Sequence, residues 1–296
     1  MNIVKVQNLT KKFGKFTALN GVNLEINEGE IYGFIGPNGA GKTTTIRVLL
    51  GILQATEGTV TVFDKDAWQD AVEIHKRIAY VPGDVNLWDN LTGGEVIDLF
   101  IKLQGTDNKK RKEELIKKFD FDPTKKCSTY SKGNRQKVAL IAALASNADF
   151  YILDEPTSGL DPLMETVFKE CIFELKKQKK TILLSSHILH EVEALCDKIS
   201  IIRKGKIIET GTLKQLRHLM RSYVQVETKK NISAFSGLKG IYDLQKTEHG
   251  YEFEIDNSQL GEVVSYLDQF EITSFICNPP SLEELFMKHY KDEGDV

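Results

Sequence analysis

Apolar runs of strand length recur along the chain up to about residue 220, and segments with helical periodicity separate them. The runs are IYGFIG at 31–36, FYILDE at 150–155, TILLSS at 181–186 and KISIIR at 198–203. Strands that are apolar along most of their length are typical of a sheet with helices on both faces, and the connecting helices let its strands lie parallel. The pattern therefore predicts an α/β fold built on a mainly parallel sheet.

The pattern changes near residue 221. Beyond it, short alternating stretches such as YVQVET and YEFEID are separated by Gly and Asn, and a helical run, SLEELFMKHYK, follows Pro279 and Pro280. Residues 222–296 hold 6 Lys and no Arg against 14 Asp and Glu. We therefore predict a first domain over 1–221 and a small acidic C-terminal α/β domain over 222–296.

Composition limits the classes of protein to consider. The 296 residues are 41% hydrophobic, which is enough for a sizeable core, and a net charge of −3 gives no overall basic field for nucleic acid or an anionic membrane. The first residues lack the apolar stretch of a secretory signal, and no apolar run approaches the roughly 18 residues of a membrane helix. We expect a soluble, cytosolic protein whose four scattered cysteines are reduced thiols.

GPNGAGKTT, at 36–44, is the strongest single motif, because it directly follows the strand IYGFIG and opens the helix KTTTIRVLLGIL. Glycines let the backbone turn its N–H groups toward a triphosphate, Lys42 would bridge the β and γ phosphates, and the Thr43 hydroxyl would bind Mg²⁺. The alternative is a glycine-rich turn before a helix. The predicted nucleotide-contacting residues are Gly36, Pro37, Asn38, Gly39, Ala40, Gly41, Lys42, Thr43 and Thr44.

Two acids emerge from the next buried strand, in FYILDEPTSGLD. At the carboxyl end of a parallel strand, Asp154 would hold Mg²⁺ through water and Glu155 would polarise the water that attacks the γ phosphate. His187, which ends TILLSSH, could hydrogen-bond that phosphate. Taken alone, an Asp-Glu pair often only solvates a strand end, and such a histidine is often structural.

A set of motifs in a fixed order resembles the ATPase subunit of an ATP-binding-cassette (ABC) transporter over roughly residues 1–220. The motifs are GPNGAGKTT, YSKGN, YILDEP, SGLD and SSH. The resemblance implies a P-loop NTPase cassette with antiparallel β and helical subdomains, the helical one at about 85–147. It further implies ATP and Mg²⁺ as cofactors, a second copy bound head to tail, and a membrane-spanning permease.

The segment YSKGN resembles the family signature, which usually carries two glycines after the serine and then glutamine. Here Lys132 and Gly133 follow Ser131, and Asn134 stands at the glutamine position. The resemblance implies that Ser131, Gly133 and Asn134, at the amino end of a helix, contact the γ phosphate held by the partner's P-loop. Alternatively, Ser131 is only a helix N-cap.

Two further positions follow from the same resemblance. Phe13 fits the aromatic residue that stacks on adenine, although a core aromatic is the competing interpretation. After the strand RIAYVP, Gly83 replaces the usual glutamine, which would join Mg²⁺. We expect Asp84 to supply that oxygen, and a plain turn with Asp84 in solvent is the alternative.

The predicted function is an ATPase that energises solute transport through a separate permease, with export favoured by the single cassette and short acidic tail. It would lie in the cytoplasm, peripheral at the inner face of the cell membrane.

The permease would contact Val85, Leu87, Trp88 and EVIDLFIKL, or else these residues belong to the core. An ABC-type ATPase acting on ribosomes or nucleic acid is the alternative, but the charged run KKRKEELIKK looks like a solvated helix face, so no nucleic acid is expected. The C-terminal domain would stabilise or regulate the dimer, or would be an inert appendage.

Overall fold

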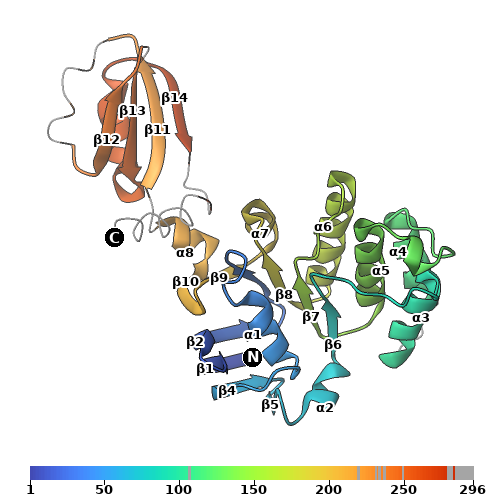
Figure 1. Cartoon of the computed structure of the whole chain (residues 1–296). Coiled ribbons are helices and arrows are strands. Elements are labelled where there is room, and N and C mark those ends of the chain that lie inside the picture. Colours follow the sequence, from blue (N-terminus) through green and yellow to red (C-terminus); the bar gives the residue numbers. More distant parts are fainter. Residues whose placement is uncertain are drawn as a thin grey trace. The chain divides into compact units, whose positions relative to one another are not determined.

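The computed structural model describes residues 1–105, 108–218, 221–230, 232, 235, 238–248, 250–278 and 283 (Figure 1). The chain divides into two compact units, Met1–Thr210 and Gly211–Val296. The boundary predicted from the sequence, residue 221, is the first residue of strand β11 (Arg221–Thr228).

The first unit contains an antiparallel sheet with the strand order β2-β1-β4-β5. Its strands are β1 (Asn2–Phe13), β2 (Phe16–Asn27), β4 (Glu57–Val62) and β5 (Lys65–Asp66). Buried and exposed residues alternate along much of β2, as a sheet with one face on the core requires. This sheet is the antiparallel subdomain that the family resemblance implied.

The second sheet has the order β10-β9-β3-β8-β7-β6, and the strands from β9 to β6 pair in parallel. Its strands are β3 (Ile31–Ile35), β6 (Ile78–Val81), β7 (Phe150–Asp154), β8 (Thr181–Ser186), β9 (Lys198–Arg203) and β10 (Lys206–Thr212). Every residue of β3, β7 and β8 is buried. The four strands predicted from apolar runs are therefore confirmed as β3, β7, β8 and β9.

Helices connect these strands, and local sequence fixes several of their starts. Thr92 and Glu95 form a reciprocal capping box at one helix, and the Asp161 carboxylate accepts from the Met164 N–H at another, before a proline in the first turn. The helical elements are α1 (Lys42–Leu49), α2 (Ala71–His75), α3 (Gly93–Leu103), α4 (Lys109–Lys118), η1 (Cys127–Thr129), α5 (Lys132–Ala145), α6 (Pro162–Lys177) and α7 (Leu189–Leu195).

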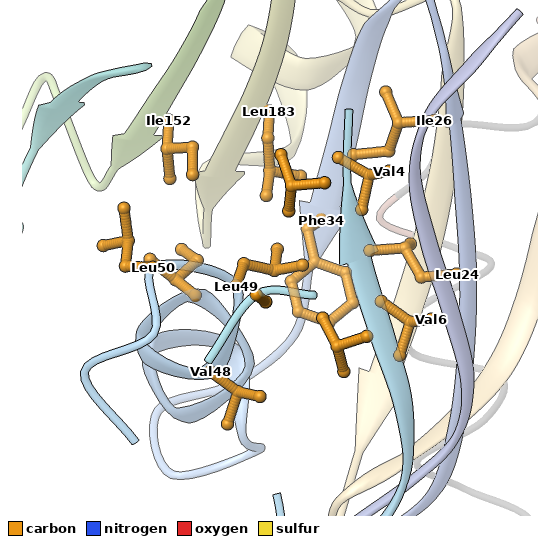
Figure 2. Packing of buried hydrophobic residues seen from close by; sticks show 14 of the residues in the cluster. Val4, Val6, Leu24, Ile26, Phe34, Val48, Leu49, Leu50, Ile152 and Leu183 are labelled. Carbon is orange, nitrogen blue, oxygen red and sulfur yellow. The ribbon is translucent and has the colours of Figure 1, made fainter. Parts of the chain in front are cut away.

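The main core lies between the two sheets, and α1 contributes to it (Figure 2). Side chains of β1 and β2 approach Phe34 of β3, and the end of α1 with the residue after it, at 48–50, packs beside them with Ile152 of β7 and Leu183 of β8. Burial of this apolar surface holds α1 against both sheets. The loop between β3 and α1 therefore has a fixed support on either side.

The second unit has its own sheet and core. The sheet order is β12-β13-β11-β14, and the remaining elements are β12 (Ile241–Lys246), β13 (Tyr251–Asp256), β14 (Ile272–Asn278), α8 (Leu213–His218), η2 (Asn257–Gln259) and α9 (Leu260–Asp268). Val224, Phe253, Ile255, Val263 and Leu267 form the centre of this core. The predicted strands YVQVET and YEFEID lie in β11 and β13, whereas the run at 281–291 falls, apart from residue 283, outside the described residues.

Two further properties of the described chain concern its cysteines and the length of its apolar helices. Cys127, Cys171 and Cys196 are buried, and all four thiols, including Cys277, are free. Within the described ranges, no helix is both long and apolar enough to cross a membrane.

Candidate active site

The loop from Gly36 to Gly41 is too tightly enclosed for side chains at two of its positions. A Cβ at Gly36 would lie 2.3 Å from the Ile202 carbonyl oxygen. One at Gly41 would lie 2.7 Å from Leu19 Cδ2, and the φ of Gly41 is 115°. The N–H groups in the first turn of a helix have no intrahelical partner, and in α1 no side chain caps them. This amino end can bind an anion through backbone N–H groups and the helix dipole.

Lys42 places its ammonium inside this loop. The side chain is only 6% exposed, and Nζ donates to the Gly36 carbonyl at 2.6 Å and to the Pro37 carbonyl at 3.4 Å. The nearest carboxylate oxygen, Oε1 of Glu155, lies 3.4 Å away. The loop thus holds a positive charge at its centre, as the predicted phosphate role of Lys42 requires.

Thr43 and Asp154 meet at the start of α1. The Thr43 hydroxyl donates to Asp154 Oδ2 at 2.9 Å, while Oδ1 is buried and has no hydrogen-bond partner. Asp154 is 2% exposed, and burial raises the pKa of its carboxyl against the lowering effect of the Thr43 hydrogen bond. A hydroxyl and an unpartnered carboxylate oxygen are hard ligands, so these residues fit Mg²⁺. No three His, Cys, Asp or Glu side chains gather as a metal site in the part of the chain that the structure describes, so such an ion would take further ligands from phosphate and water.

Glu155 lies between Lys42 and His187. Its backbone is in the left-handed region, with φ at 51°, and its N–H donates to the Ser185 carbonyl at 2.9 Å. Oε2 of Glu155 lies 2.5 Å from His187 Nδ1, while Oε1 faces Lys42 and has no hydrogen-bond partner. The His187 side chain is 54% exposed. The structure therefore brings the predicted base, lysine and histidine into one cluster with an open side.

Ser131 is the N-cap of α5, and its Oγ accepts from the Asn134 N–H at 3.4 Å. Its side chain is also exposed, so capping leaves the amino end of α5 accessible. A Cβ at Gly133 would lie 2.4 Å from the Gly159 carbonyl oxygen, which explains why glycine is needed there. YSKGN thus lies directly against SGLD of the same chain.

Polar contacts extend this packing. The Lys132 ammonium donates to Ser158 Oγ at 2.8 Å, and the buried Gln136 amide donates to the Pro156 carbonyl at 3.0 Å. These contacts join α5 to the segment that follows Glu155. These contacts could not be predicted from the sequence, because they depend on two segments meeting in space.

Phe13, Gly83 and Asp84 lie at different places. Phe13 is 47% exposed, so the competing interpretation as a core aromatic is wrong. A Cβ at Gly83 would lie 3.3 Å from the Asp154 carbonyl oxygen and 3.4 Å from Glu155 Cβ, which places Gly83 beside the acids. Asp84 is exposed and lines a cavity of 230 Å³ with residues of α5. Its predicted bond to Mg²⁺ stays a prediction.

Comparison with known proteins gives matches over both units. Residues 19–158 match the family described as ABC transporter, and residues 211–290 match the C-terminal domain described as ATP-binding protein DrrA1-3-like. The chain is 31% identical to YhaQ of Bacillus subtilis, an uncharacterized ABC transporter ATP-binding protein, over 97% of this chain and 98% of YhaQ. It is 30% identical to the bacitracin transport ATP-binding protein BcrA of Bacillus licheniformis, over 97% of this chain and 96% of BcrA.

Solved structures match the cassette. A structure described as an ATP-binding subunit of an ABC transporter superposes with a TM-score of 0.68 at 30% identity, over 73% of this chain and 92% of the other. The ATP-binding cassette MJ0796, a dimer in a post-hydrolysis state with ADP and Pi, gives a TM-score of 0.63 at 28% identity, over 71% of this chain and 98% of MJ0796.

Proposed function

Since the chain belongs to the ATP-binding proteins of ABC transporters, an ATPase family, we propose that it powers solute export through a separate membrane-spanning permease. The observation that carries the ATP-hydrolysing part of this proposal is the cluster of Lys42, Asp154, Glu155 and His187 around the amino end of α1.

Backbone N–H groups of the loop and the amino end of α1 would bind the ATP phosphates, with the Lys42 ammonium at their centre. Thr43 and Asp154 would hold Mg²⁺, which when bound neutralises charge on the β and γ phosphates. Asp84 is a further proposed ligand of this ion. An Asp84→Ala variant with unchanged ATPase rate and unchanged Mg²⁺ dependence would contradict that assignment.

Glu155 would act as the general base. Its Oε2 would accept a proton from the water that attacks the γ phosphate, and His187, on the exposed side of the cluster, would hydrogen-bond that phosphate. His187 and Lys42 each face one oxygen of Glu155, so both groups can orient the base.

The test of this mechanism is Glu155→Gln, which keeps the size of the side chain and removes the base. Hydrolysis should slow by roughly 10²- to 10⁴-fold while ATP still binds, because only the proton acceptor is lost. Glu170→Gln, the same change at an exposed position of α6, is the matched control and should hydrolyse ATP normally. Wild-type turnover in Glu155→Gln would contradict the role of Glu155.

We propose that the complete site needs a second copy bound head to tail. Ser131, Gly133 and Asn134 of the partner would contact the γ phosphate, and Phe13 would stack on adenine. The exposed serine at the amino end of α5 and the exposed ring of Phe13 support this arrangement, since both are accessible to a ligand or another chain.

A largely apolar cavity of 550 Å³ supports docking of a permease. Val85 and Leu87 line it together with Phe100 and Leu103 at the exposed end of α3, so it suits the apolar face of a short helix. Trp88 is exposed and lies near Phe100, with ring centroids 6.2 Å apart. Leu103→Glu should abolish copurification with a membrane protein from detergent and leave the ATPase activity of the isolated chain intact. Unimpaired copurification would contradict docking here.

Export is proposed because the chain combines one cassette with a DrrA-like C-terminal domain, and because BcrA, a relative along nearly its whole length, is named for bacitracin transport. The chain would then lie in the cytoplasm, at the inner face of the membrane. Inside-out vesicles that contain this chain and its permease should accumulate substrate when ATP is added outside. Accumulation only in right-side-out vesicles with ATP inside would contradict export, and recovery with ribosomes alone would favour the alternative function.

A further inference from the structure

Helix α7 buries a carboxylate that the proposed mechanism does not use. Glu191 is fully buried, although it lies only a few residues after His187. Its Oε2 accepts from the Thr157 hydroxyl at 3.1 Å and from the Ser186 hydroxyl at 3.4 Å. Its Oε1 is buried and has no hydrogen-bond partner.

The two hydroxyls belong to the two segments that carry the catalytic pair. Thr157 lies two residues after Glu155, and Ser186 immediately precedes His187. Ser186 Oγ also accepts from the backbone N–H of Ile188 at 2.9 Å, so the same hydroxyl fixes the backbone on the far side of His187. One carboxylate oxygen therefore joins the backbones from which Glu155 and His187 project.

We propose that Glu191 is a positioning residue that ties the segment after Glu155 to the segment around His187. It thereby holds the Glu155 carboxylate within 2.5 Å of the His187 ring. This inference rests on the proposed catalytic roles of Glu155 and His187. Glu191 itself acts only through Thr157 and Ser186.

The energetics make a purely structural role a poor explanation. A buried carboxyl with one unpartnered oxygen destabilises a fold, and an apolar side chain of similar size is often neutral or stabilising at such a site. Burial raises the pKa of Glu191, against the lowering effect of the Thr157 hydrogen bond. Glutamine therefore resembles the neutral form that burial favours and retains an oxygen for both hydroxyls.

The experiment compares Glu191→Met with Glu191→Gln in the full chain. Methionine fills a similar volume without an acceptor, so kcat should fall roughly tenfold through misplacement of the catalytic pair, with ATP affinity unchanged. Glutamine should restore most of kcat. Glu170→Met, the same substitution at an exposed position of α6, is the matched control and should leave kcat unchanged. Wild-type kcat in Glu191→Met, or equal loss in the Met and Gln variants, would overturn the proposal.

Thr157→Val and Ser186→Ala test the same connection without an apolar side chain in the place of Glu191. Each should lower kcat by itself, and adding Glu191→Met to the Thr157→Val/Ser186→Ala double variant should cause little further loss, because that variant already lacks both hydroxyls that Glu191 binds. Independent, multiplying losses would overturn the proposal. Wild-type kcat in both single hydroxyl variants would overturn it as well, and that result does not depend on the folding of Glu191→Met. Failure of the catalytic assignment is separate, since it would appear as normal turnover in Glu155→Gln.

Discussion

At the scale of single residues, Asp154 shows how the site conflicts with stability. Its carboxyl is buried at the end of β7, one oxygen has no partner, and burial raises its pKa. The ionised form of this buried carboxyl is therefore poorly solvated. The charge is useful only when a cation can bind beside Thr43.

Asp154→Asn should consequently raise the melting temperature of the nucleotide-free protein at neutral pH by a few degrees, while Mg²⁺-dependent hydrolysis is lost. Because the pKa is higher in the folded state than in the unfolded chain, wild-type stability falls as pH rises between the two values. The advantage of Asn should therefore shrink when the pH is lowered through this window. Thermal unfolding at several pH values measures this stability advantage. An Asp154→Asn variant less stable than wild type at neutral pH would contradict a destabilising effect of the buried carboxylate.

The sequence was informative for residues whose chemistry is local. GPNGAGKTT specifies its own backbone, so the neighbourhood of Lys42, Thr43 and Asp154 could be predicted from strand and helix context. Glu191 could not, because a lone glutamate in an amphipathic helix normally lies on the surface. Likewise, the approach of Gly133 to the Gly159 carbonyl depends on the start of α5 meeting a turn that lies after β7.

At the scale of elements, an ion-pair network connects α4 with α6. Glu174 of α6 receives Arg111 Nη2 at 2.6 Å and Lys118 Nζ at 2.5 Å, and both bases come from the run KKRKEELIKK. Lys112 of the same run pairs with Asp98 of α3 at 2.6 Å. Three of its basic residues thus join helices and are only partly exposed, so the solvated face predicted for this run is limited to its other charged residues, which are exposed.

Glu174→Gln should loosen α4 from α6 and increase hydrogen exchange in α4. Burial acts to raise the pKa of Glu174, but the hydrogen bonds from Lys118 and Arg111 hold this pKa below its usual range. The stabilisation should thus be present at neutral pH and lost as pH falls through the folded-state pKa. Partial exposure of these groups limits the effect to about 1 kcal/mol. Glu170→Gln on the same helix is the control, and equal exchange in both variants would contradict a role for the network.

The strands of the parallel sheet were predictable because they are apolar on both faces, whereas β1 and β2 were expected only from the family resemblance. Their pairing contains several register shifts, which interrupt the alternation of apolar and polar residues. A pattern with period two is therefore hard to recognise there. Helix α7 was also hard to recognise from helical periodicity, because it is only 7 residues long.

At the scale of the whole molecule, the acidic C-terminal unit has its own core and sheet, so it can fold as a module. We predict that it stabilises or regulates the dimer, since its negative charge can attract the slightly basic remainder of the chain. Removing residues from 213 onward, which leaves β10 complete, should weaken dimer formation in ATP. High salt should weaken the full-length dimer similarly. Unchanged dimerisation, stability and ATPase rate after truncation would remove this role.

Two copies of the chain are proposed to share each active site, and mixing two inactive variants tests whether they do. Lys42→Ala removes the phosphate-binding ammonium, and Ser131→Arg adds bulk at the surface offered to the partner. Each variant alone should be nearly inactive. In a mixed dimer, the intact P-loop of the Ser131→Arg chain would meet the intact YSKGN of the Lys42→Ala chain. A chain carrying both changes, mixed with Lys42→Ala, is the matched control because no complete site can form.

ATPase activity and ATP-dependent dimer formation should both be measured after mixing, since the two sites of a dimer can depend on each other. The shared site predicts that some hydrolysis returns in the mixture of single variants and that none returns in the control. Mixed dimers that form at wild-type affinity without any recovery of ATP binding or hydrolysis would contradict the shared site and leave Ser131 as an ordinary helix cap.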